Sequence, residues 1–341
     1  MFQNRPCVVI GSNSFTGSHI VDALLERSSS PVVGISRSPE YKDIFLPYKS
    51  RKNKNNLFSF YQIDIVQQFD PLIKLLDRLK PAVVINVAAL SEVSMSHEVP
   101  LEYFDTNTTA VVKLCTYLRS CSYLERYVHI SSAEVFGTCG QPADEQTRFN
   151  PSTPYAVSKA AADMFLHTLI KNFKFPAIMI RSTNVYGKHQ QLFKIIPRTI
   201  INLKLQQPVD LHGGGEAIKS FVHVQDVVEG ILRAIERGKP GAYHFTSSNH
   251  ESVAQIVQKI CRWMGQDFNS LTRVTQDRIG QDHRYWLDAS KAKRELGWET
   301  AINFEQGFHE VKKWIEDNWA SVQQESLVYV HRKNSLPAFS V

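Results

Sequence analysis

Short apolar runs rich in β-branched residues alternate with amphipathic stretches along the first half of the chain. They read CVVIG at 7–11, GSHIVDALLER at 17–27, PVVGIS at 31–36, FDPLIKLLDRL at 69–79 and AVVINVAA at 82–89, followed by YVHISS at 127–132, a helix from residue 155 and AIMIRSTNVYG at 177–187. Strands of about five residues that alternate with helices are typical of βαβ units. The sequence therefore predicts an α/β fold with a doubly wound parallel sheet.

The turn after the first predicted strand has the composition of a phosphate-binding loop. Gly11, Ser14 and Gly17 follow the spacing GxxGxxG, with serine in the middle position. Glycines let the backbone approach a pyrophosphate, and the next helix offers free N–H groups at its N-terminus. We predict a Rossmann-like dinucleotide site, the alternative being a plain strand-to-helix turn. Its predicted contacts here are Gly11, Ser14, Phe15, Thr16 and Gly17.

The residues after the next strands indicate which dinucleotide binds. No carboxylate directly follows the strand at 31–36 to hold the ribose of NAD, and Arg37 and Ser38 stand there instead. A guanidinium beside a hydroxyl suits a 2′-phosphate, which favours NADP, with NAD possible and a plain surface arginine as the alternative. Asp64 is placed to accept a hydrogen bond from adenine, or else only caps the following helix. Ile65, Ala88 and Ala89 complete the predicted cofactor contacts.

The alternation of strands and helices loosens after residue 187. The remainder combines loops such as HGGGE at 212–216 with helices predicted at 224–236, 252–264 and 304–318. We expect residues 1–187 to form mainly the dinucleotide-binding domain. Residues 188–320 are expected to form mainly a smaller, interleaved α/β lobe that binds substrate, and no structure is predicted for the tail at 321–341.

The composition of the chain limits which binding partners and which cellular location are expected. The formal charge is only +6 over 341 residues, and the basic run YKSRKNKNN at 48–56 is predicted to be a solvated loop. An anionic small molecule is therefore a better expected partner than nucleic acid. The five cysteines form no CxxC pair and have no histidine at zinc-finger spacing, so no metal or disulfide is expected. Without a signal peptide or an apolar run approaching about 18 residues, a cytoplasmic protein away from membranes is expected.

A tyrosine and a lysine share one face of the helix predicted from residue 155. In PYAVSK, Tyr155 and Lys159 are four residues apart, so the lysine ammonium can lie near the phenol and lower its pKa. Taken alone, the pair is better explained as a half-buried tyrosine packed against the lysine side chain. The surrounding sequence therefore decides whether the pair is catalytic or structural.

Six stretches, PYAVSK among them, supply that context. They are NVAALSEVSMS (86–96), HISSAEVFG (129–137), PYAVSK (154–159), RSTNVYGKHQQLFKIIP (181–197), LHGGGEAIKSFVHVQD (211–226) and DRIGQDHRYWLDASKAKRELGW (277–298). With them the chain resembles the extended short-chain dehydrogenase/reductase family from about residue 6 to 319. Within that family it is most similar to nucleotide-sugar 4,6-dehydratases, above all those that act on dTDP-glucose.

The resemblance implies a catalytic set. Tyr155 would take the proton of the hexose C4 hydroxyl, Lys159 would lower the tyrosine pKa and hold the nicotinamide ribose, and Ser132 would donate a hydrogen bond to the C4 oxygen. Glu134 matches the residue that removes the C5 proton after oxidation at C4. Ala133 replaces an aspartate thought to protonate the departing C6 hydroxyl in dTDP-glucose enzymes. Enzymes for GDP-mannose also lack that acid, and their glutamate carries the proton from C5 to the C6 oxygen.

The resemblance also implies substrate contacts and an assembly. Helices at about 104–120 and 155–172 would pair in a homodimer through a four-helix interface. Glu134 is also found in UDP-glucuronate decarboxylases, so a decarboxylase stays open, as do a 4-epimerase and, less favoured, a non-catalytic NADP-binding regulator. The expected contacts with the nucleotide sugar are Ser91, Asn184, Lys194, His212, Lys219 and Arg284.

Overall fold

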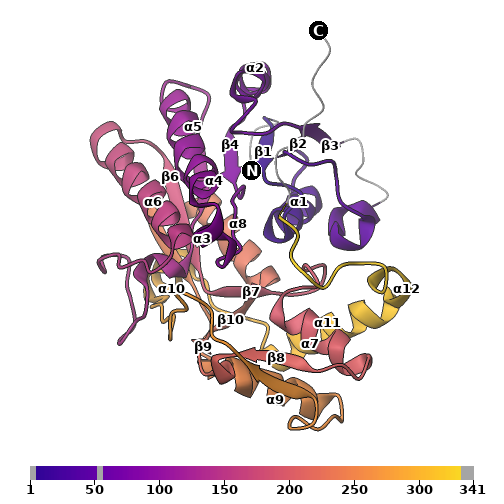
Figure 1. Ribbon diagram of the computed structural model, residues 1–341. Coiled ribbons are helices and arrows are strands. Elements are labelled where there is room, and N and C mark those ends of the chain that lie inside the picture. The colour runs from indigo at the N-terminus through magenta and orange to yellow at the C-terminus, as the bar shows by residue number, and fades with distance from the viewer. Residues whose placement is uncertain (1–4, 52–56, 332–341) are drawn as a thin grey trace.

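The computed structural model describes residues 5–51 and 57–331, and its largest element is a parallel sheet (Figure 1). The seven strands have the order β11-β6-β5-β4-β1-β2-β3, and all neighbours are parallel. This confirms the predicted doubly wound α/β fold. The strands are β1 (Cys7–Ile10), β2 (Val32–Ser36), β3 (Phe58–Gln62), β4 (Val83–Asn86), β5 (Arg126–Ile130), β6 (Ala177–Ser182) and β11 (Gly241–Phe245).

Helices cover both faces of this sheet because the strands are apolar on both sides. Val9 and Ile85 point into one core, whereas Val8 and Val84 point into the other. The first core is closed by α1 (Phe15–Arg27), α8 (Val224–Arg237) and α10 (Ser290–Leu296). The second is closed by α2 (Phe69–Leu79), α5 (Ala110–Leu118) and α6 (Pro154–Phe173).

The helix expected at 104–120 is continuous but not uniform. It consists of α4 (Pro100–Phe104), a π-helical turn at Asp105–Thr109 and α5, and it follows the short helix α3 (Met95–Glu98). Within the π-helical turn, the amide of buried Asn107 bonds both the N–H and the C=O of Leu90 at 2.9 and 3.0 Å. This contact fixes the loop that follows β4.

The smaller lobe has its own apolar core and three two-stranded sheets. The pairs are β7 (Asn184–Tyr186) with β10 (Phe221–His223), β8 (Val209–His212) with β13 (Thr272–Thr275), and β9 (Ile218–Lys219) with β12 (Glu251–Ser252). Its core is built by α7 (Ile195–Lys204), α9 (Val253–Trp263), α11 (Phe304–Asp317) and α12 (Trp319–Val322).

The two parts of the chain interleave. After the excursion through β7–β10, α8 packs on α1 and β11 joins the edge of the main sheet beside β6. Buried Trp298 then bonds the carbonyl of Asp226 at 2.7 Å, so residues near 298 also belong to the first core. The helices predicted at 224–236, 252–264 and 304–318 are confirmed as α8, α9 and α11 to within one residue at each end.

Two segments have more structure than the sequence predicted, the basic run at 48–56 and the tail after residue 320. The basic run at 48–56 begins in a 3-10 helix, Pro47–Ser50, in which Tyr48 is buried and donates a hydrogen bond to Glu40 at 2.8 Å; residues 52–56 lie outside the described part. The tail continues through α12, and residues 323–331 then run through turns and bends past α1 toward the larger domain (Figure 1). None of the helices in the described ranges is long and apolar enough to cross a membrane.

Candidate active site

The turn between β1 and α1 brings the backbone to the C-terminal edge of the sheet. Gly11 has φ +86°, and a Cβ there would lie 2.5 Å from the backbone nitrogen of Ala88. A Cβ on Gly17 would meet the carbonyl of Gly11. Ser14 caps α1, since its hydroxyl accepts from the Gly17 N–H at 3.1 Å and donates to the Gly11 carbonyl at 2.7 Å. The serine thus stabilises the turn in place of the usual middle glycine.

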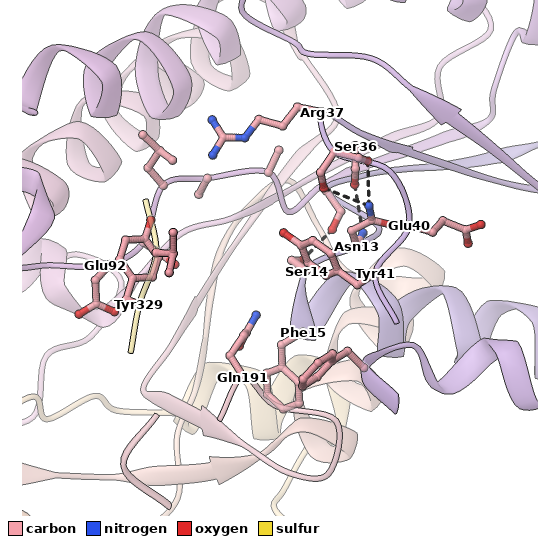
Figure 2. A pocket seen from close by; sticks show the side chains of 18 of the residues that line it. Asn13, Ser14, Phe15, Ser36, Arg37, Glu40, Tyr41, Glu92, Gln191 and Tyr329 are labelled. Carbon is pink, nitrogen blue, oxygen red and sulfur yellow. Dashed lines mark hydrogen bonds between the residues drawn. The ribbon is translucent and has the colours of Figure 1, made fainter. Parts of the chain in front are cut away.

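A cavity of about 730 Å³ opens over this turn (Figure 2). Its size suits the adenosine and phosphates of a dinucleotide. Gly17 does not line it and serves the close packing of α1 on the turn. The predicted cofactor contacts that line it are Gly11, Ser14, Phe15, Arg37, Ser38, Asp64, Ile65, Ala88 and Ala89, while Thr16 lines the adjoining smaller cavity.

The end of β2 forms one wall of the larger cavity. Asn13 donates from its side-chain amide to the carbonyls of Ser38 and Pro39 at 3.0 and 2.7 Å, which fixes the loop that carries Arg37. Asp64 accepts from the N–H groups of Val66 and Gln67 at 2.7 and 3.3 Å. Its Oδ1 therefore caps a turn before α2, close to the alternative that the sequence left open.

The predicted catalytic residues meet in a second cavity of about 250 Å³. After β5, Ser132 caps the 3-10 turn Ala133–Phe136 and Glu134 lies within it, while Tyr155 and Lys159 lie in the first two turns of α6. The helix begins here because Thr153 accepts from the Ala156 N–H at 3.2 Å and Pro154 is its first residue. Ser91, Asn184 and Lys194, three predicted substrate contacts, line the same cavity.

Tyr155 differs from the expectation in its electrostatics. Burial and the nearby Glu134 raise the pKa of Tyr155 well above its ordinary value, and a hydrogen bond with Ser132 lowers it. Lys159 is not among the groups that shift the pKa of Tyr155 here, so the lowering expected from it stays a prediction. The Lys159 ammonium instead lies 3.2 Å from His129 Nε2 and donates to the Ile130 carbonyl at 2.5 Å. Burial lowers the pKa of Lys159 to about 8.

Glu134 is a buried carboxyl aimed into the catalytic cavity. Burial raises the pKa of Glu134 to about 7, although Lys219 and a hydrogen bond from Tyr285 oppose this. Within the described residues its Oε2 has no hydrogen-bond partner. Asp282 also influences the pKa of Tyr285, whose ring centre lies 3.9 Å from the Lys219 ammonium. A carboxyl of this kind exchanges protons readily near neutral pH.

Three predicted substrate contacts do not line either cavity. Lys219 packs over the ring of Tyr285 and donates a hydrogen bond to the Asp282 carbonyl at 3.1 Å. The Arg284 guanidinium carbon lies 3.7 Å from the centre of the Trp286 ring. His212 ends β8, with its Nδ1 3.0 Å from the Thr275 hydroxyl. All three lie in the smaller lobe, on the strands and loops beyond the catalytic cavity.

Several residues at these cavities had no role in the prediction. Glu92 lies after β4 and pairs with Lys194 at 3.0 Å, joining the two lobes between the cavities. Tyr285 stands inside a stretch already singled out, so its position was a usable signal. Tyr329, from the tail, lines the larger cavity, and no sequence pattern marked it. In the described ranges no three His, Cys, Asp or Glu side chains are grouped to hold a metal.

A parallel sheet, a glycine turn and a Ser–Tyr–Lys set at its C-terminal edge define an extended short-chain dehydrogenase/reductase. The sequence model of one family, described as GDP-mannose 4,6 dehydratase, matches residues 8–311, and the chain belongs to that family.

Known relatives share most of the chain's length. It is 31% identical over 271 residues to a dTDP-glucose 4,6-dehydratase of Xanthomonas campestris, covering 73% of this chain and 77% of the relative. It is 28% identical to the human dTDP-D-glucose 4,6-dehydratase, covering 93% and 92%. The solved dTDP-glucose 4,6-dehydratase of Streptomyces venezuelae, with NAD bound, superposes with a TM-score of 0.85 at 25% identity, covering 93% and 98%.

Proposed function

We propose that this chain is a nucleotide-sugar 4,6-dehydratase, a hydro-lyase that uses a nicotinamide dinucleotide and releases a 4-keto-6-deoxyhexose nucleotide. The observation that carries the proposal is Glu134, a buried carboxyl with a pKa of about 7 in one cavity with Ser132 and Tyr155. Oxidation at C4 alone requires no such carboxylate, whereas removal of a proton from C5 does. The names of the relatives agree with this reading.

The residues present fit the cofactor. A side chain at Gly11 would fill the space beside the Ala88 backbone, and the two cavities share Ser14, Phe15, Ala89 and Ser91 in their walls. A molecule with an adenosine end and a nicotinamide end can therefore extend from one cavity into the other. An oxidised nicotinamide held there would supply hydride transfer from C4 and back to C6, and its positive charge would favour the tyrosinate.

Tyr155 and Ser132 serve the C4 oxygen. The tyrosinate takes the hydroxyl proton as C4 becomes a ketone, and the Ser132 hydroxyl donates to the same oxygen. Lys159 contributes its positive charge from one helical turn away. Its ammonium is held between His129 and the Ile130 carbonyl, which fixes the side chain without a carboxylate contact.

Glu134 then acts at C5 and C6. The new ketone acidifies the C5 hydrogen, Glu134 removes that proton, and the same carboxyl delivers it to the departing C6 hydroxyl as water forms. Residue 133 is a buried alanine and supplies no acid, so one carboxyl serves both steps. The hydride from C4 would end on C6, and C5 would take up one proton. That proton balances the one taken from the C4 hydroxyl. The net change is the loss of one water molecule.

A panel of nucleotide sugars tests the proposal directly. The chain should convert at least one nucleoside-diphosphate hexose to its 4-keto-6-deoxy product and incorporate solvent deuterium at C5. A 4-epimer without solvent label would show an epimerase, and carbon dioxide from a uronic acid nucleotide would show a decarboxylase. Dinucleotide binding without any turnover on the panel would favour a regulator.

For the cofactor we propose NADP in preference to NAD, although the solved relatives from Streptomyces venezuelae and Bacillus anthracis carry NAD. Arg37 lines the larger cavity at the end of β2, with Ser38 beside it. Glu40, the nearest acid along that loop, accepts hydrogen bonds from Tyr48 and Lys49 at 2.8 and 2.7 Å. The local charge available to a 2′-phosphate is therefore positive.

We also propose a homodimer formed through the helices at 100–118 and 154–173. These helices lie side by side at one edge of the molecule (Figure 1). Leu101 is 78% exposed on α4 and Met164 is 62% exposed on α6, and Val157 is also exposed. Large apolar side chains gathered on paired helices suit a second copy of the same surface.

A further inference from the structure

The C-terminal segment crosses from the smaller lobe to the cofactor site. After α12 the chain runs past α1 toward the larger domain, shown in yellow in Figure 1. Five of its residues line the 730 Å³ cavity together with the glycine turn and Arg37. They are Glu325, Ser326, Val328, Tyr329 and Val330.

Three side-chain contacts hold this segment in place. Glu325 forms an ion pair with Lys42, which belongs to the loop after β2. The Tyr329 ring packs edge-on against Phe193 of the loop before α7, with ring centres 5.4 Å apart. Beyond it, His331 Nε2 lies 2.9 Å from Glu102 Oε2 on α4. The segment is therefore tied at both ends and in the middle, to elements on different sides of the cavity.

The segment forms a wall of the cavity and does not fill it. The volume of about 730 Å³ remains with these residues in position. Tyr329 lies beside Glu92, across the cavity from Asn13, Tyr41 and the α1 turn (Figure 2). A dinucleotide that occupies the cavity would thus be enclosed between the glycine turn on one side and the tail on the other.

We propose that residues 325–331 are a strap that closes the dinucleotide site and retains the cofactor from one turnover to the next. The inference rests on the proposed function in one respect, because a dehydratase regenerates its cofactor in every turnover and needs no exchange of dinucleotide. The strap lies beyond residue 311, where the match to the family ends.

Dinucleotide release tests the strap without any sugar substrate. The full chain would be loaded with NADPH, chased with excess NADP⁺, and followed by the loss of protein-bound NADPH fluorescence. Truncation after Gln324 and the substitution Tyr329→Ala should each speed release on the order of tenfold, because lost contacts act mainly on dissociation rates. Equal release rates in all three proteins would overturn the proposal. So would tighter NADPH binding by the truncated chain, which would make the tail a competitor of the cofactor.

A matched pair of point variants covers the case in which truncation impairs folding. Glu102→Gln replaces the carboxylate that contacts His331, whereas Glu98→Gln replaces an exposed carboxylate on neighbouring α3. Faster release with Glu102→Gln alone supports the strap, and identical release by the two variants contradicts it. Strap-dependent NADPH release without turnover of any nucleotide sugar would reject the proposed function and leave the strap standing.

Discussion

The side chain of Tyr285 lies beside the carboxyl of Glu134 and lowers the pKa of that carboxyl through hydrogen bonding. The two residues come from different lobes and are joined above the catalytic cavity. This bond stabilises the ionised form of Glu134 and so opposes the effect of burial on its pKa. The readiness of Glu134 to act as a base is therefore set partly by the smaller lobe.

Substitution of Tyr285 by phenylalanine should move the pH dependence of elimination. Without the hydroxyl, the pKa of Glu134 rises above about 7, so the base becomes available only at higher pH. One net hydrogen bond is worth about 0.5–1.5 kcal/mol, which corresponds to a shift of up to about one pH unit. The acid limb of C5 deuterium incorporation measures this, with Tyr61→Phe as the control. An unmoved limb would exclude Tyr285 from tuning Glu134.

Glu134→Gln should separate oxidation from elimination. Oxidation at C4 depends on Ser132, Tyr155 and Lys159, so the variant should still develop the absorbance of reduced nicotinamide when substrate is added. It should then stall, because an amide cannot accept the C5 proton, and product should form about 10²–10⁴-fold more slowly. Single-turnover absorbance followed by product analysis gives both quantities. Full product formation by the variant would remove Glu134 from the mechanism.

The same variant should change stability with a defined pH dependence. The pKa of Glu134 is raised from 4.5 to about 7 in the folded chain. The folded state therefore binds the proton more tightly, and this contribution to stability is full below pH 4.5 and lost as pH rises through 7. Relative to wild type, Glu134→Gln should gain about 3 kcal/mol in unfolding free energy between those limits. Urea unfolding across that range measures the difference in unfolding free energy. A difference that does not change with pH would contradict the raised pKa of Glu134.

Arg37→Ala should weaken NADP binding and spare NAD. A hydrogen bond to a charged group is worth about 1.5–3 kcal/mol, so the loss should be about 10- to 100-fold in Kd for NADP. Calorimetric titration of the cofactor-stripped chain with each dinucleotide gives both constants. Arg119→Ala, whose side chain stacks on Phe173 away from the cavity, is the matched control. Equal affinities for NADP and NAD, unchanged by Arg37→Ala, would refute the preference.

Met164→Glu should dissociate the proposed dimer. A carboxylate in the centre of an apolar helix interface would be buried without a partner. Sedimentation velocity should find the wild-type chain at twice the 38.8 kDa monomer mass and the variant at the monomer mass. Val274→Glu, at an equally exposed apolar position in the smaller lobe, should remain a dimer. A wild-type chain that sediments as a monomer would contradict the assembly itself.

The sequence predicted those features of the fold and site that depend on residues close together in the chain. The strands around Gly11, the start of α6 at Pro154 and the YxxxK pair all depend on residues a few positions apart. The pKa of Tyr155 did not follow from that pair, because burial and Glu134 raise it, while the Lys159 ammonium lies beside His129, thirty residues away in the chain. The tail was unpredictable for the same reason, since Lys42 and Glu325 are 283 positions apart in the chain.

The parallel sheet receives its last strand late. β11 joins β6 only after the chain has passed through β7–β10, and α8 and α10 cover the first core from the same late region. A nascent chain that ends near residue 187 would present β6 as an open edge and leave one face of the sheet partly bare, a state prone to pairing with other chains. Synthesis must therefore proceed beyond residue 298 before the dinucleotide domain can be complete. Cutting the chain between its lobes would not yield two independent folding units.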